Sequence, residues 1–99
     1  MTIKEIKKNN EIILQIEGRI DTNTSAVLQD KVLKSLQKSS YLTLDLTETD
    51  YVSSAGLRTF LIAYKTAVSK GGSFQLCNVS ENVLRVLKES GFSKLLKIE

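Results

Sequence analysis

Residues 41–61 read YLTLDLTETDYVSSAGLRTFL, and this one stretch contains a strand, a loop and the start of a helix. Tyr41 to Leu46 alternate apolar and polar side chains, which predicts an inner β-strand. From Leu57 onward, apolar side chains recur at helical spacing along one face, at Phe60, Leu61, Tyr64 and Val68. A strand that leads into a helix is typical of α/β domains with parallel strands, and the stretch predicts that class of fold.

The segment before this stretch predicts a β-hairpin followed by a helix. Thr2–Lys7 and Glu11–Glu17 alternate apolar and polar side chains on either side of Lys8-Asn9-Asn10, and asparagine tolerates the left-handed backbone of a tight turn. The cap-forming cluster DTNTS comes next, and helical spacing of apolar side chains predicts a helix over Ala26–Lys38.

The segment after this stretch predicts a strand, a helix and a last strand. Gly71-Gly72 ends the second helix, and Ser73–Cys77 is β-prone. Ser80 is placed as the N-cap of a third helix, and Gly91 suits the left-handed position that follows its end. A short final strand is expected from Leu95, Leu96 and Ile98.

The predicted order of elements is therefore β-β-α-β-α-β-α-β in one domain that spans residues 1–99. Parallel strands need long crossover connections, and the predicted helices lie where those connections are needed. We expect an α/β fold with a mixed sheet and its helices mainly on one face. The core should consist mostly of Leu, Ile and Val, because aromatic residues make up only 6% of the chain.

Composition excludes several classes of protein. No secretion signal or membrane-spanning segment is recognisable, which predicts a cytoplasmic protein without direct membrane insertion. The chain has no histidine and a single cysteine, Cys77, which we expect in the core and which offers no disulfide or metal site. The net charge is +3, but the lysines are scattered without interleaved aromatic residues, so nucleic acid is not an expected partner.

The two serines of the SSAGL turn have different local tasks. If Ser53 is the N-cap, the apolar side chains of Val52 and Leu57 are placed to form the hydrophobic staple. If Ser54 were the cap, the staple positions would hold Ser53 and Arg58, which cannot make that apolar contact. Local chemistry therefore assigns the cap to Ser53. Ser54 then occupies the first helical position, where its hydroxyl has no structural task and where an added phosphate would meet free N–H groups and the positive end of the helix dipole.

Gly56 stands in the first turn of the same helix, where glycine costs roughly 1 kcal/mol relative to alanine. Either tight packing of the helix on the sheet or the close approach of another group to the backbone would account for it. A serine nucleophile is not expected at this turn, because the chain has no histidine base and no G-x-S-x-G pattern. The sequence predicts a protein that is not an enzyme.

The segments GRIDTNTS (18–25) and LDLTETDYVSSAGLRTFL (44–61) resemble the STAS domains, in particular the single-domain anti-sigma-factor antagonists of bacteria. The resemblance implies a partner switch in transcription regulation. The unphosphorylated protein binds a serine kinase that is also an anti-sigma factor, phosphorylation at Ser54 releases it, and a serine phosphatase reverses the change. ATP and magnesium belong to the kinase, so no cofactor is expected.

The resemblance also implies a partner-binding surface on two loops and the helix start, formed by Asp21, Thr22, Asn23, Ser53, Ser54, Ala55, Gly56 and Arg58. Ser53 stands where many members of the family have aspartate, and Ala55 stands where they have a second hydroxyl. Two other uses of the fold remain open: a non-phosphorylated subunit of an ABC-type lipid transport system, and an adaptor in a larger sensory complex.

Overall fold

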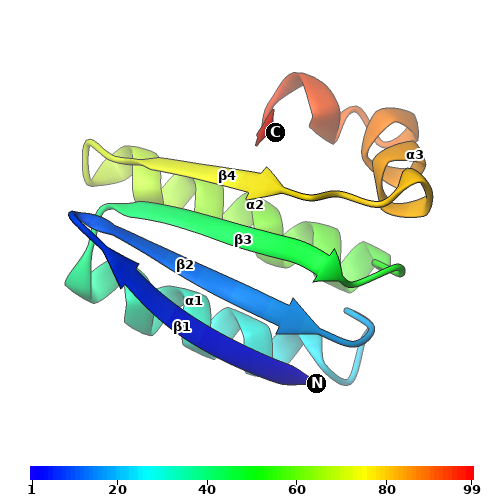
Figure 1. Cartoon of the computed structure of the whole chain (residues 1–99). Helices are drawn as coiled ribbons and strands as arrows, with labels where there is room; N and C mark the ends of the chain where they lie inside the picture. Colours follow the sequence, from blue (N-terminus) through cyan, green and yellow to red (C-terminus); the bar gives the residue numbers. More distant parts are fainter.

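The computed structural model describes residues 1–99 and contains one five-stranded sheet with its strands in sequence order, β1-β2-β3-β4-β5. Three helices connect the parallel strands, and a short 3-10 helix follows the third (Figure 1). The elements are β1 (Thr2–Lys8), β2 (Glu11–Glu17), α1 (Ser25–Lys38), β3 (Tyr41–Glu48), α2 (Ser54–Ser69), β4 (Ser73–Cys77), α3 (Glu81–Glu89), the 3-10 helix Phe92–Lys94 and β5 (Lys97–Ile98). The predicted α/β order is confirmed, with the 3-10 helix as an addition.

The sheet is mixed, as predicted. β1 and β2 form an antiparallel hairpin in which Lys8 pairs with Glu11, and Asn9 takes a positive φ of 59° in the two-residue turn. The other three neighbouring pairs, β2–β3, β3–β4 and β4–β5, are parallel. A parallel pair cannot be closed by a tight turn, and here each one is connected through a helix.

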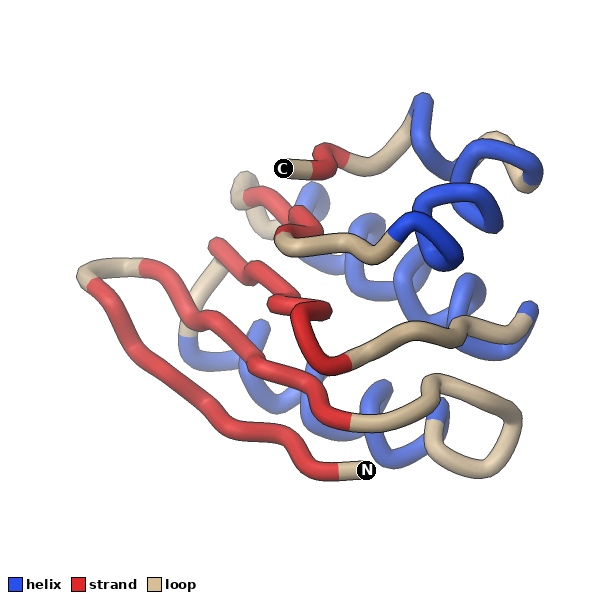
Figure 2. The backbone as a smooth tube through the Cα atoms, turned by 45° about the vertical axis from the view of Figure 1, so that its right-hand side comes forward, coloured by secondary structure: helices blue, strands red, loops and turns tan.

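Helices α1 and α2 lie together behind the sheet, on one face of it, while α3 lies toward the end of the sheet where β4 finishes (Figure 1). The tube in Figure 2 shows the same two layers from the side, with the hairpin strand β1 at one edge. The opposite face of the sheet carries no helix. The prediction that the helices gather mainly on one face is confirmed.

The core lies between the sheet and α1 and α2, and it is built mostly from aliphatic side chains. Alternate residues of a strand point to the same face of the sheet, and in β3 this places Leu42, Leu44 and Leu46 in the core. Of the nineteen buried hydrophobic residues, nine are Leu, three are Ile and three are Val. The rings of Phe60 and Phe74 add a tilted aromatic contact with centroids 6.3 Å apart.

The buried face of α2 differs from the predicted one. Phe60 is buried as expected, but Val68 is 50% exposed, and Ala63 and Ala67 are fully buried in its place. α2 packs against both α1 and β4, and small side chains allow the helix backbones to approach closely. Tight packing against α1 and β4 therefore decides which face of α2 is buried. The hydrophobicity of the side chains alone predicted the wrong face.

Two further predictions need correction: the last strand is present but shorter than expected, and Cys77 was wrongly placed in the core. The last strand comprises only Lys97 and Ile98; Leu96 is buried just before it, and Leu95 is 42% exposed. Cys77 lies half-buried on the open face of the sheet, opposite Asp45 in the register of β3 and β4, and not in the core. Burial, and then the nearby carboxylates of Asp45, Glu99 and Glu11, raise the pKa of its thiol.

None of the helices combines the length and the apolar character needed to cross a bilayer.

Candidate functional site

Ser53 caps α2, as predicted. Its backbone is extended (φ −87°, ψ 175°), and its Oγ accepts a hydrogen bond from the Gly56 N–H at 3.4 Å. Its carbonyl accepts the first helical bond, from the Leu57 N–H at 3.0 Å. Because the hydroxyl of Ser53 is engaged in starting the helix and its side chain is half-buried, it is poorly placed to react with another protein.

Ser54 is the first residue of α2, and its side chain is exposed. Its hydroxyl makes no hydrogen bond within the protein, and the N–H groups of Ser54 and Ala55 have no acceptor in the chain. The first turn of α2 contains no acidic side chain, so nothing in the helix balances the positive end of its dipole. The position can therefore accept a negative group without displacing anything.

Gly56 is buried at the point where α2 crosses the two strand-to-helix loops. A Cβ atom at this position would lie 2.7 Å from Cγ2 of Ile20 and 2.8 Å from Cγ1 of Val52, which is closer than real Cβ contacts. Of the two explanations that the sequence left open, the structure supports tight packing of the helix. Gly56 therefore lets α2 sit deeply enough to bring its first turn against the loop that contains Ile20.

The loop before α1 and the loop before α2 are held together by their backbones. Ile20 and Val52 form an isolated parallel bridge, in which the Ile20 N–H donates to Tyr51 O at 3.0 Å and the Ser53 N–H donates to Ile20 O at 2.8 Å. Both apolar side chains are buried beneath the loops. The segments 21–23 and 53–58, which lie far apart in the sequence, thus become neighbours at one end of the sheet.

Asp21 organises the turn that leads into α1. Its Oδ1 accepts hydrogen bonds from the N–H groups of Thr24 (3.0 Å) and Asn23 (2.9 Å), while the Thr24 hydroxyl accepts the Asp21 N–H at 2.9 Å. The pKa of the Asp21 carboxyl is lowered despite some burial. The largest cause is the hydrogen bond from the Thr24 N–H, followed by the Asn23 N–H, the Thr24 hydroxyl and the charge of Arg19. These contacts keep the Asp21 carboxylate in its charged form at one edge of the predicted partner-binding surface.

The remaining predicted residues differ in how they face solvent. Thr22 and Asn23 are exposed at the tip of the loop, and Arg58 is exposed one turn into α2. Ala55 is half-buried. Because Ala55 carries no hydroxyl and Ser53 is engaged as the cap, Ser54 is the one free hydroxyl of the SSAGL turn.

Two further contacts at this end of the sheet escaped the sequence analysis. The Arg19 guanidinium lies over the Tyr51 ring at 4.0 Å from its centroid and 3.7 Å from a carboxylate oxygen of Asp21. The Asn82 side chain of α3 donates to Asp50 Oδ2 at 2.9 Å, which ties the loop before Ser53 to a third element. Exposed Arg and Tyr beside a candidate site are a recognisable signal, but their pairing requires the fold.

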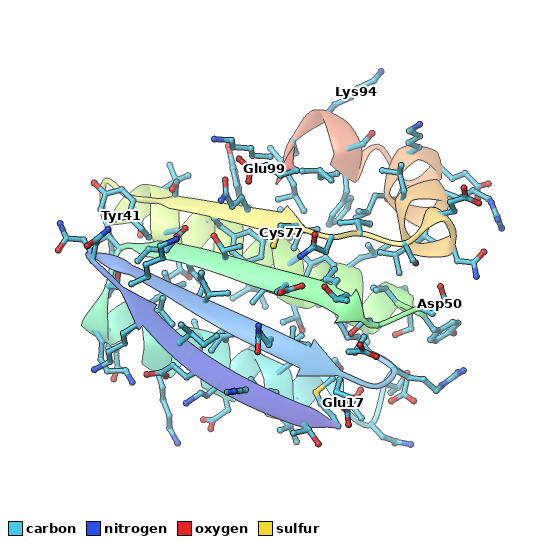
Figure 3. All side chains as sticks on the ribbon, in the orientation of Figure 1. Glu17, Tyr41, Asp50, Cys77, Lys94 and Glu99 are labelled. Atoms are coloured by element: carbon cyan, nitrogen blue, oxygen red, sulfur yellow. The ribbon has the colours of Figure 1, made fainter.

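The surface around Ser54 is exposed and not a cleft. The four surface hollows of the protein are lined by other parts of the chain, and none includes a residue from 18–24 or 49–58. Figure 3 shows Asp50 and Glu17 at one end of the sheet and Tyr41 at the other. The serine turn begins at Ser53, three residues after Asp50 in the sequence. An open surface of this kind suits docking to another protein better than catalysis on a small molecule.

Comparison with known proteins gives a consistent result. The family model for the STAS domain matches residues 3–99. An anti-sigma-B factor antagonist from Bacillus subtilis (strain 168) is 30% identical over 95 residues, which cover 95% of this chain and 87% of that protein.

Solved structures have the same fold. The anti-sigma factor antagonist SpoIIAA in its unphosphorylated form superposes with a TM-score of 0.84 at 14% identity, covering 99% of this chain and 88% of that chain. The Bacillus cell fate determinant SpoIIAA in its phosphorylated form superposes with a TM-score of 0.76 at 13% identity, covering 99% and 91%.

Proposed function

The chain belongs to the STAS domain family, and from this premise we propose that it is an anti-sigma factor antagonist whose binding is switched off by phosphorylation of Ser54. The family membership and the relatives' names support the antagonist role. The proposed phosphorylation switch rests on the different roles of the two serines at the start of α2. Ser53 supplies the cap, and Ser54 presents an exposed hydroxyl with no structural task.

In the proposed cycle, the unphosphorylated surface of 21–23 and 53–58 binds an anti-sigma factor that is also a serine kinase. The kinase supplies ATP and magnesium, and this chain supplies only the acceptor hydroxyl. A phosphate would add about −1.5 to −2 charges at neutral pH to the centre of the surface. Binding then weakens because a desolvated contact is replaced by a charged, hydrated group. A serine phosphatase would restore the binding form.

The domain itself is expected to tolerate the modification. The phosphate would lie beside the free N–H groups of Ser54 and Ala55 and at the positive end of the α2 dipole, where negative charge is stabilising. The fold of the switched-off form should therefore be unchanged, and the effect of phosphorylation is confined to the interface.

The test is phosphorylation by the cognate kinase, followed by mass measurement of the intact protein and of its peptides. We expect one added phosphate on Ser54 in the wild type and in Ser53→Ala, and none in Ser54→Ala. Binding of the wild type to the kinase, measured by calorimetry without ATP, should weaken when the phosphorylated protein is used. Modification at Ser53, or an active cognate kinase that leaves the chain unmodified, would contradict the proposal.

A further inference from the structure

Arg58 is an exposed arginine that has no ionic partner. The ion pairs of the protein are Arg19–Asp21, Lys31–Glu5, Lys34–Asp30, Lys38–Glu5 and Lys97–Glu99. The guanidinium of Arg58 is absent from these pairs, and the one arginine whose side chain donates a hydrogen bond within the protein is Arg85. A fully charged side chain is thus held in solvent at the edge of the surface described above.

Arg58 stands four residues after Ser54 on α2. Residues at this spacing lie on the same side of a helix, with about 5–6 Å between their Cβ atoms. A negative group that precedes a positive one at this spacing is the favourable order, because both charges then also agree with the helix dipole. The long arginine side chain can therefore reach an anion placed on Ser54.

No carboxylate is available to compete for Arg58 along its own helix. α2 contains no Asp or Glu between Ser54 and Ser69, in contrast to the Asp30–Lys34 pair on α1 and Glu81 in the first turn of α3. The two acidic side chains of the adjoining loops are already engaged. Asp21 is bound by backbone N–H groups and Arg19, and Asp50 accepts from Asn82.

We infer that, once Ser54 is phosphorylated, Arg58 binds the phosphate across the first turn of α2 through charge-assisted hydrogen bonds from its planar fork. This inference rests on the proposed function and deepens it. Phosphorylation then changes the surface in two ways. It adds a negative group at Ser54, and it withdraws the free cation of Arg58 that an acidic partner surface would otherwise contact.

The experiment uses the full chain with phosphoserine incorporated at position 54 during translation, so that it does not depend on the kinase. The second ionisation of the phosphate, at a pKa near 6 for phosphoserine, is followed by phosphorus NMR. Arg58 favours the dianion, so the pKa should rise by about 0.2–0.4 in Arg58→Gln, the size expected for an exposed pair at this spacing. Arg58→Lys keeps the charge without the fork and should give a smaller rise.

Lys65→Gln is the matched control, since it removes one exposed charge from the same helix about 10 Å or more beyond Arg58, where salt screens its field. It should leave the phosphate pKa unchanged. Equal phosphate pKa values in the wild-type and Arg58→Gln phosphoproteins, or equal shifts in Arg58→Gln and Lys65→Gln, would overturn the inference.

A second measurement avoids the phosphoprotein. Ser54→Asp should raise the urea midpoint more when Arg58 is present than in the Arg58→Gln background, and equal changes would count against the pair. A chain that no kinase modifies would defeat the proposed function while leaving this pair intact, so the two failures are distinguishable.

Discussion

Gly56→Ala tests whether the start of α2 is positioned by packing or by helix propensity. Propensity alone predicts stabilisation by about 1 kcal/mol, because alanine is the better helix former. Packing predicts the opposite, since the new Cβ would lie 2.7 Å from Ile20 Cγ2 and 2.8 Å from Val52 Cγ1. Both neighbours are buried β-branched side chains that cannot rotate away freely.

The expected magnitude follows from these two opposing effects. Overpacking of a well-filled core typically costs about 1–3 kcal/mol, and two contacts below 3.0 Å place this case toward the upper end. After the gain in propensity, Gly56→Ala should lower the free energy of unfolding by about 1–2 kcal/mol. Urea unfolding followed by far-ultraviolet circular dichroism measures this change directly.

Val52→Ala provides the matched comparison, because it removes the Cγ1 atom that the new Cβ would meet. In a double-mutant cycle, Gly56→Ala should cost less in the Val52→Ala background than in the wild type. Stabilisation by Gly56→Ala in the wild type, or strict additivity of the two substitutions, would refute the packing explanation and reduce Gly56 to an ordinary flexible residue.

Three further predictions concern the cap, the switch and an ion pair. Ser53→Ala should lower the free energy of unfolding by about 0.5–1 kcal/mol, since the bond to Gly56 is long, while phosphorylation of Ser54 persists; unchanged urea stability would remove Ser53 from the cap. Ser54→Asp should keep the melting temperature at or slightly above that of the wild type and weaken partner affinity in calorimetry, whereas a large drop in melting temperature would show that Ser54 has a structural role. Glu5 accepts hydrogen bonds from Lys38 and then Lys31, which lower its pKa from the usual 4.5, so its stabilisation is present above that pH and is lost as the pH falls through the folded-state pKa. Glu5→Gln should therefore be least stable relative to wild type near neutrality, and the difference should shrink in urea titrations as the pH falls below 4.5. A difference that is independent of pH would exclude this ionic contribution.

Features that depend on a few consecutive residues could be predicted from the sequence. Ser53 was assigned as the cap from Val52 and Leu57, which are its near neighbours in the chain, and the structure agrees. Ser80 caps α3 through the Val83 N–H, and Gly91 adopts the left-handed backbone, again from local chemistry. Capping and turn formation act over three or four residues, so the information needed for them is contiguous in the chain.

Features that depend on how elements pack could not be predicted in the same way. The sequence suggested Val68 for the buried face of α2, but contact with α1 and β4 buries Ala67 and leaves Val68 exposed. Cys77 was expected in the core, yet the register of β4 turns it to the open face of the sheet. Hydrophobicity predicts that a side chain is buried, but it does not say which neighbour will bury it.

Periodicity and adjacent residues were enough to establish the order of elements, the mixed sheet, the cap at Ser53 and the free hydroxyl at Ser54. Only the tertiary structure shows that the Asp21 loop lies beside the start of α2, where the bridge between Ile20 and Val52 holds it. The tight packing around Gly56 is also visible only in the structure. The cation–π contact and the side-chain bond from α3 at the same end of the sheet likewise needed the fold. The physical reason is that these contacts join residues far apart in the chain, and their proximity is set by the packing of the whole core.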